Sequence, residues 1–152
     1  MGKIMELKNW LRNNWFDEEV ERLFVRPEKT FHHIEMEHFG LTEQQLRYQL
    51  FEKSAATVFT ISYGEFLDIL HAALVRLANS ICYAEAVGDT NRQHAIIQLS
   101  KKVGYGFTRK DGEKTTSNTF EVIWSVENGE LRIITAYPKI DGTDDEYPDV
   151  YL

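Results

Sequence analysis

The sequence predicts an α+β domain in which helices precede a twisted antiparallel sheet. Residues 62–88 have the apolar spacing of a long amphipathic helix, the strongest helical pattern in the chain. Residues 120–137 instead alternate between apolar and polar side chains around Asn128-Gly129, which is typical of a β-hairpin. Because the helical patterns come first and the strand patterns follow, the order favours α+β over alternating βαβ units.

The composition is that of an ordinary globular domain. The chain has 152 residues, of which 43% are hydrophobic and 27% charged, and this fits a single domain spanning residues 1–152. The lone cysteine, Cys82, allows neither an internal disulfide nor a cysteine-based zinc site, and its place near an apolar stripe predicts a packing role. No run reaches the ~20 apolar residues of a membrane span, so we expect no membrane partner.

The first 28 residues predict a helical segment in front of the core. An apolar stripe indicates a helix over residues 3–13, and Asp17 can cap a second short helix. Arg26-Pro27 would close this segment, because the residue before proline avoids helical dihedrals. We expect residues 1–28 to form a lid over the core; the alternative is a partner surface formed by Trp10, Trp15 and Phe16.

A histidine-rich helix is predicted between Thr30, as the N-terminal cap, and Gly40, as the C-terminal stop. It contains His32, His33 and His38, and histidine can exchange a proton near neutral pH. His33 and His38 are five residues apart, about 500° around a helix, so they cannot share a face. This spacing matches no familiar zinc motif, and we expect no metal site. From spacing alone, the histidines are polar surface residues.

The central region predicts two helices and a strand. Thr42 starts a helix in which Leu46, Gln49, Leu50 and Lys53 follow at helical spacing, and Ala55–Thr60 favours a strand. The long helix begins with the capping box Ser62-Tyr63-Gly64-Glu65 and ends at Gly88.

The second half predicts strands. Residues 96–108 indicate one or two strands, in which Gly104 and Gly106 suggest a bulge or a close approach of another backbone. A two-residue turn at Asn128-Gly129 would pair Trp124 with Ile133, and then the following pairs: Val122 with Thr135 and Phe120 with Tyr137.

Thr135 and Tyr137 are expected on one face of the last long strand, about 6.5–7 Å apart. Two hydroxyls so placed can bracket a phosphate. Threonine and tyrosine are also common strand residues with no chemical role, and the spacing does not separate these alternatives.

The net charge of −7 disfavours broad electrostatic capture of nucleic acid, and we expect no DNA partner. The charge is uneven, because the predicted acidic tail, residues 139–152, contains five acidic residues. The segment 99–139 has seven Lys or Arg residues against five acidic ones, which leaves room for a local phosphate site.

Five short motifs follow one another between residues 31 and 138. They are His33, His38 and Gly40; Leu46 and Leu50; Ala56-Thr57-Val58-Phe59; Val103-Gly104; and Thr135-Ala136-Tyr137-Pro138. Their order and spacing resemble the RNase A-like toxin domain at the C-termini of bacterial contact-dependent growth inhibition (CdiA) proteins. The resemblance covers roughly 70% of the chain, and it implies an RNase A-like core over residues 31–138 with a two-lobed cleft.

The resemblance implies a metal-independent endoribonuclease toxin that needs no cofactor, with His38, Thr135 and Tyr137 as catalytic residues. His38 would take the proton from a ribose 2′-OH, and Thr135 would hold a non-bridging phosphate oxygen. Tyr137 or a protonated imidazole would assist the leaving oxygen, and the product would be a 2′,3′-cyclic phosphate. His33 would be a supporting neighbour.

The implied partners are an RNA substrate, with tRNA among the candidates, and a cognate immunity protein. The implied place of action is the bacterial cytoplasm, either after delivery into target cells as part of a secreted protein or as a stand-alone relative.

One family residue is replaced in this chain. The family has an arginine eleven residues after its second histidine, where this chain has Gln49. Arg47 lies two residues earlier, about 200° around the helix. Arg47 and Gln49 are therefore candidate supporting residues. The alternative function is a catalytically weak or inactive relative that acts as a protein-binding module.

Overall fold

The computed structural model describes residues 27–140 and 148–152. The predicted N-terminal lid, apart from its last two residues, and residues 141–147 of the predicted acidic tail lie outside the described residues. The elements are, in order, α3 (Pro27–His38), α4 (Glu43–Gln49), β1 (Ala55–Phe59), α5 (Tyr63–Val87), β2 (Gln93–Gln98), β3 (Gly104–Thr108), β4 (Thr115–Ser117), β5 (Thr119–Glu127), β6 (Glu130–Pro138) and β7 (Val150–Tyr151). The predicted α+β class is confirmed.

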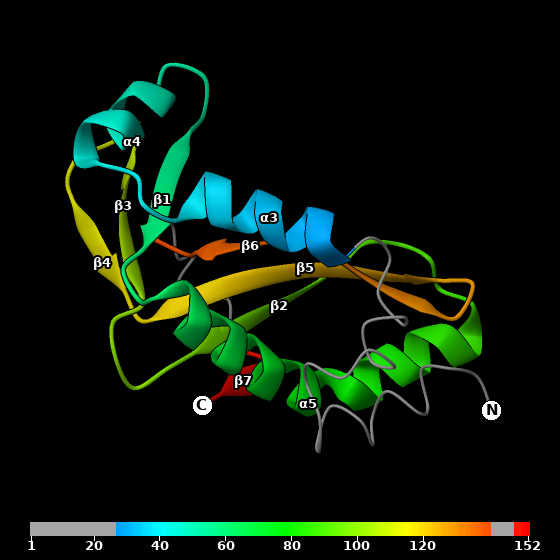
Figure 1. The fold of residues 1–152 in the computed structure, drawn as a ribbon. Coiled ribbons are helices and arrows are strands. Elements are labelled where there is room, and N and C mark those ends of the chain that lie inside the picture. Colours follow the sequence, from blue (N-terminus) through cyan, green and yellow to red (C-terminus); the bar gives the residue numbers. More distant parts are fainter. Residues whose placement is uncertain (1–26, 141–147) are drawn as a thin grey trace.

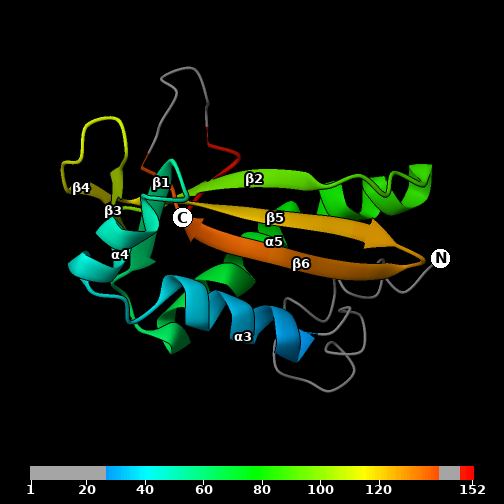
Figure 2. The ribbon, with the colours of Figure 1, turned by 90° about the horizontal axis from the view of Figure 1, so that it is seen from above.

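Within the described residues the strands form two sheets rather than one. The larger sheet has the order β6-β5-β2-β7 and the smaller sheet the order β1-β3-β4. Figure 1 shows α5 beneath the larger sheet, while α4 and the smaller sheet form a separate lobe at one end. In Figure 2, α3 runs alongside β6, and no described helix lies over the opposite face of β2, β5 and β6. We call this the open face.

The main core lies between α5 and the larger sheet. Ser62 caps α5 by accepting a hydrogen bond from the Glu65 amide at 3.1 Å, and Gly88 ends the helix at φ +71°, as predicted. The Glu65 carboxylate pairs with Lys101 instead of returning to Ser62, so only half of the predicted capping box forms. The buried stripe of α5 comprises Phe66, Leu70, Ala73, Leu74, Leu77, Ala78, Ile81 and Ala84. By length and composition α5 could cross a membrane, but its stripe packs on the sheet like that of a core helix.

The smaller lobe has its own core of Leu46, Ala56, Val58 and Phe107. Thr42 caps α4 and forms a capping box with Gln45. β1 pairs with β3 so closely that a Cβ at Gly104 or Gly106 would collide with the carbonyl oxygen of Val58 or Ala56. The predicted close approach of another backbone is therefore confirmed, and it holds β1 tightly against β3.

The hairpin forms at Asn128-Gly129, where both residues have positive φ (54° and 72°), as a type I′ turn requires. The predicted pairing is correct from Glu127–Glu130 to Trp124–Ile133. Beyond it the prediction is wrong by one residue. A β-bulge makes Ile134 an extra residue, so Thr135 pairs with Ile123 and Tyr137 with Glu121.

Helix α3 begins at Pro27, so the prediction that Thr30 caps it is wrong. The predicted end of the preceding segment at Arg26 lies outside the described residues. Proline is well tolerated at the first helical position, where its missing N–H would have no partner in any case. Gly40 follows the helix at φ +70°, which agrees with the predicted stop.

The last residues return to the larger sheet. β7 pairs in parallel with β2, and Val150 is buried in the main core. The Ile96 amide donates a hydrogen bond to Oδ2 of Asp149 at 2.8 Å. The end of the predicted acidic tail is therefore an edge strand of the fold.

Candidate functional site

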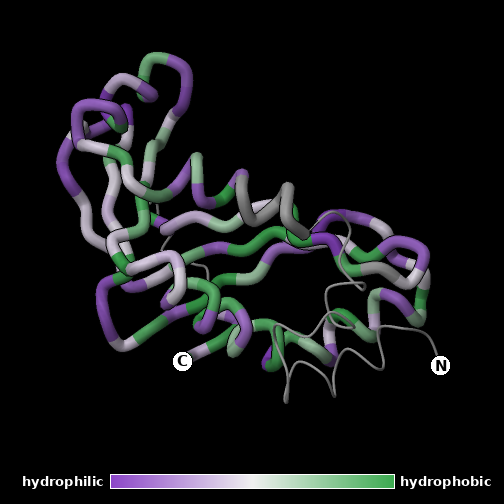
Figure 3. The backbone as a smooth tube through the Cα atoms, viewed as in Figure 1, coloured by the Kyte–Doolittle hydropathy of each residue, from purple (hydrophilic) through white to green (hydrophobic). Residues whose placement is uncertain are grey.

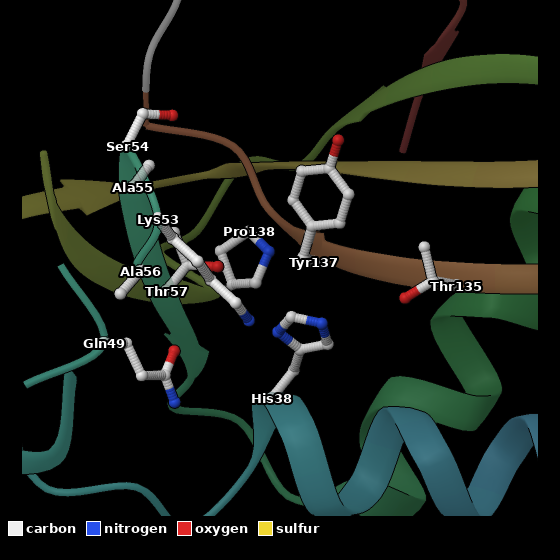
Figure 4. Close-up of a pocket in the computed structure, with 10 residues that line it drawn as sticks. All are labelled: His38, Gln49, Lys53, Ser54, Ala55, Ala56, Thr57, Thr135, Tyr137 and Pro138. Atoms are coloured by element: carbon white, nitrogen blue, oxygen red, sulfur yellow. The ribbon is translucent and has the colours of Figure 1, made fainter. Parts of the chain in front are cut away.

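His38, Thr135 and Tyr137 lie in one cavity of about 360 Å³. The cavity lies between the two lobes and is lined by His38, Gln49, Lys53, Ser54, Ala55, Ala56, Thr57, Thr135, Tyr137 and Pro138. Figure 4 shows the imidazole of His38 pointing from α3 towards the Tyr137 ring, with the Thr135 hydroxyl on one side and the Lys53 amine on the other. The structure thus brings together the three side chains that the sequence singled out.

His38 is held in place by its neighbours in sequence. Ile34 lies one helical turn earlier and is fully buried, so it fixes the face of α3 on which His38 also lies. Phe39 stacks on Phe59 with ring centroids 4.9 Å apart and meets Phe66 edge-on at 5.4 Å. His38 therefore stands between two apolar anchors, which limits its movement.

The exposed histidine of α3, His33, does not line this cavity. His33 lies on the exposed side of the helix, as the 500° separation predicted. It is near enough for its charge to lower the pKa of His38, so its effect is electrostatic. The side chain of His32 lies outside the described part of the chain.

Burial keeps the imidazole of His38 neutral. The pKa of His38 is lowered from 6.5 to about 4, and loss of solvation is the largest cause. The charges of Lys53 and His33 contribute to the lowering, while the Thr57 backbone, through a hydrogen bond, and the charge of Glu37 oppose it. Nδ1 of His38 is buried and has no hydrogen-bond partner among the described residues. At neutral pH this histidine can accept a proton.

The bulge at Ile134 decides which way Thr135 and Tyr137 face. Ile133 points into the main core with Trp124, and in a regular strand Thr135 and Tyr137 would point the same way. The extra residue moves Ala136 and Pro138 to the core side and turns the two hydroxyl side chains to the cavity. Bulges often aim a side chain at a site in this way.

Tyr137 is fixed by Glu121, a residue that the sequence did not single out. The Tyr137 hydroxyl donates a hydrogen bond to Oε2 of Glu121 at 2.5 Å, and Nδ1 of His94 lies 2.9 Å from Oε1. Lys139 Nζ lies 3.8 Å from Oε2 of the same carboxylate. Glu121 is buried, with only 8% of its surface exposed. A glutamate within an apolar strand was a signal that could have suggested this network.

The Tyr137 side chain therefore extends from His38 at one end to Glu121 at the other. Its ring lies 5.9 Å from the His38 ring, measured between centroids, at an interplanar angle of 39°. Its hydroxyl points away from His38, towards the open face where Glu121 lies (Figure 4). A base and a hydroxyl are thus held at opposite ends of one aromatic side chain.

The cavity contains Gln49 and not Arg47. Arg47 turns to the other side of α4, where its guanidinium lies 4.1 Å from the centre of the Phe107 ring and Nη1 donates to the Gly112 carbonyl at 3.0 Å. Arg47 therefore does not take the place of the family arginine in this cavity.

Lys53 supplies the positive charge instead. The turn after α4 continues the helical spacing, and the Lys53 amide donates to the Gln49 carbonyl at 2.9 Å. Lys53 therefore returns to the side of α4 that carries Gln49, and its amine points towards His38 (Figure 4). The four-residue spacing from Gln49 was the signal that could have identified it.

The described residues thus define a class of protein: an α+β domain with a neutral, half-buried histidine, two hydroxyl side chains and a lysine around one interlobe cavity. No family model matches the chain, and no curated protein matches it. A chain in the crystal structure of the CdiA-CT/CdiI complex from Y. kristensenii 33638 matches it with a TM-score of 0.62 and 18% sequence identity.

That match covers 71% of this chain and 98% of the other chain. The two proteins therefore share a fold, and the shared part is nearly the whole of the solved chain. The match supports a fold related to that of contact-dependent growth inhibition toxins, and the RNase A-like type of that fold stays a prediction.

Proposed function

We propose that the chain is an endoribonuclease toxin domain that cleaves RNA by attack of a ribose 2′-OH on the adjacent phosphorus. The observation that carries the proposal is the convergence of His38, Thr135 and Tyr137 in one cavity, from segments about a hundred residues apart in sequence. The shared fold with a chain of a CdiA-CT/CdiI complex supports the toxin class.

In this mechanism His38 is the general base. Its pKa of about 4 keeps it unprotonated at neutral pH, so it can take the proton of the 2′-OH. The 2′-oxygen then bonds to phosphorus as the bond from phosphorus to the 5′-oxygen breaks, and the leaving 5′-oxygen takes a proton from the Tyr137 hydroxyl. The products are a 2′,3′-cyclic phosphate and a 5′-OH, and solvent carries the proton on His38 back to Tyr137.

The remaining cavity residues stabilise the charge that develops on the phosphate. Thr135 donates its hydroxyl hydrogen to a non-bridging oxygen, and Lys53 provides the positive charge that an arginine provides in the family. Tyr137 presents its hydroxyl at the end of the site away from His38, where an in-line reaction places the leaving oxygen. Glu121 and His94 hold that hydroxyl in position.

The proposed biological setting follows from the same fold. A toxin of this kind acts on RNA in the cytoplasm of a bacterial target cell and is neutralised by a cognate immunity protein. Gln49 in the cavity favours one alternative, a weak or inactive relative that binds a protein partner. Lys53 argues against it, because a cation is still present beside His38.

The test is cleavage of a synthetic RNA by the purified chain in the presence of EDTA. We expect His38→Gln to lower kcat/KM by about 10²–10⁴-fold, as for loss of a general base. His33→Gln is the matched control, because it changes an exposed histidine of the same helix, and we expect it to retain activity. A 2′-deoxy substitution at the cleaved position should abolish product formation.

Turnover that requires a metal, or that survives His38→Gln, would contradict this mechanism. Absence of turnover by the folded wild-type chain on tRNA, rRNA and synthetic RNA would favour the binding-module alternative.

A further inference from the structure

A second cavity lies on the other side of the turn that follows α4. Its volume is about 470 Å³, and it is lined by Arg47, Leu50, Phe51, Thr108, Arg109 and Gly112. Phe51 is 82% exposed, which is unusual for a large apolar side chain. Figure 3 shows a short hydrophobic stretch between hydrophilic segments at the outer tip of this lobe, where α4 leads into β1.

Two guanidinium groups are fixed at the walls of this cavity. Arg109 Nε donates to the Leu50 carbonyl at 2.8 Å, and Arg47 is held by the Gly112 carbonyl and the Phe107 ring. Each guanidinium has five N–H donors, so one bond to a carbonyl leaves others for a ligand. Both arginines are exposed, and the cavity therefore presents oriented donors and positive charge to solvent.

The aromatic wall is also supported. The exposed rings of Tyr48 and Phe51 pack edge to face, with centroids 5.7 Å apart and an interplanar angle of 67°. Tyr48 therefore limits the movement of Phe51 while a ring face of Phe51 stays open to solvent.

The second cavity adjoins the candidate site. Ala55 lines the first cavity and Thr108 the second, yet the two residues are direct partners in the β1–β3 pairing, which places their Cα atoms about 4.5–5.5 Å apart. Lys53 lines the first cavity and Phe51 the second, from the same turn. An RNA strand that leaves the first cavity past Lys53 therefore reaches the second cavity within a short distance.

We propose that the second cavity binds an unpaired nucleotide of the RNA substrate close to the cleaved bond, with its base on Phe51 and its phosphate at Arg47 and Arg109. Stacking on an aromatic ring beside basic side chains is how proteins hold single-stranded RNA. A concave cavity of this size fits one small group better than it fits a protein surface. The proposal rests on the proposed function, because it extends the path of the same substrate.

The test compares cleavage of a dinucleotide, too short to reach the second cavity, with cleavage of a hexanucleotide that contains the same scissile step. We expect Phe51→Ala to raise the ratio of the hexanucleotide KM to the dinucleotide KM by about tenfold, the size of one lost base stack. Phe51→Trp should restore the ratio, because it keeps an aromatic face. Tyr83→Ala is the matched control, because Tyr83 is a 70% exposed aromatic residue of α5.

Binding separates this inference from the proposed function. If the wild-type chain cleaves neither substrate, the proposed function fails, and the affinity for an uncleaved hexanucleotide still tests the cavity by fluorescence anisotropy. We expect Phe51→Ala to weaken that affinity about tenfold. An unchanged KM ratio and an unchanged affinity would overturn the nucleotide site and would leave the exposed aromatic pair as a surface for a protein partner.

Discussion

At the scale of single residues, the site combines a neutral base with a nearby fixed cation. His38 owes its low pKa mainly to burial, and Lys53 lowers it further because an ammonium group disfavours a second positive charge nearby. The same ammonium group would stabilise negative charge on a phosphate. Lys53 therefore supports the proposed reaction through the charge of the transition state, whereas its effect on His38 makes that base weaker.

We expect Lys53→Gln to lower kcat by about 10²–10³-fold, the range for loss of one group that stabilises developing charge. Lys53→Arg should retain most activity, because it keeps the charge. The measurement is single-turnover cleavage of a saturating RNA, with circular dichroism to confirm folding. Lys102→Gln is the control, because Lys102 is an exposed lysine of a loop that does not line the cavity.

Gln49→Arg in the Lys53→Gln background provides a rescue. Gln49 lines the cavity, so an arginine there restores a cation at the family position. We expect it to recover part of the lost rate. If Lys53→Gln alone cleaves RNA at the wild-type rate, this lysine has no part in the mechanism.

At the scale of elements, the site depends on two irregularities of the sheets. The first is the bulge at Ile134, which turns Thr135 and Tyr137 away from the core. The second is the close pairing of β1 with β3 across Gly104 and Gly106, which fixes the wall from Ser54 to Thr57 opposite His38. Regular strands alone would not bring these side chains to one cavity.

We expect Gly106→Ala to destabilise the fold by about 1–3 kcal/mol, because the new Cβ would collide with the Ala56 carbonyl and backbone cannot yield as a side chain can. Gly64→Ala is the matched control. Nothing lies within 4 Å of a Cβ at Gly64, and alanine favours the first turn of α5, so this variant should be neutral or slightly stabilising. Urea denaturation of both variants measures the difference, and equal stabilities would count against a tight β1–β3 contact.

Local patterns predicted the elements more reliably than their pairing. Ser62 as the N-cap, Gly88 as the helix end and Asn128-Gly129 as the turn act as predicted, because capping and turn formation depend on neighbouring residues. The bulge was missed because no glycine or other local signal marks Ile134, and its position depends on packing of both strands against the core. The Thr30 cap was wrong because Pro27 was interpreted only as a breaker and not as a first helical residue.

The same contrast between local patterns and tertiary packing holds for the site residues. His38, Thr135 and Tyr137 were predicted from motifs, and the structure places them together. Glu121 and Lys53 were not singled out, since their roles depend on which strand lies next to Tyr137 and on how the turn after α4 points. Such contacts between distant segments are set by tertiary packing rather than by local spacing.

At the scale of the whole molecule, the cavity exists only where the two lobes meet. It takes His38 from α3, Gln49 and Lys53 from the smaller lobe, and Thr135 and Tyr137 from the larger sheet. The main core joins Ile34 of α3 to the helix and strands of the larger lobe. Unfolding of either lobe would therefore expose His38 to water, and this links its protonation to global stability.

That link predicts a specific acid sensitivity. The pKa of His38 is about 4 in the folded chain and 6.5 when solvated, so between these values the unfolded chain binds the extra proton. His38 therefore does not reduce the free energy of unfolding above about pH 6.5. The free energy of unfolding falls as the pH is lowered from about 6.5 to about 4, and below about pH 4 His38 causes no further loss. At pH 5 the loss relative to pH 7 should be about 1–2 kcal/mol.

Carboxylates also titrate in acid, so the informative quantity is the difference between wild type and His38→Gln. Urea denaturation at pH 7 and pH 5 should show a smaller acid loss in His38→Gln by about 1–2 kcal/mol. His33→Gln, on the exposed side of the same helix, should lose as much stability in acid as wild type. If His38→Gln and wild type lose stability in parallel, burial does not lower the pKa of His38, and its assignment as the base then rests on its position in the cavity alone.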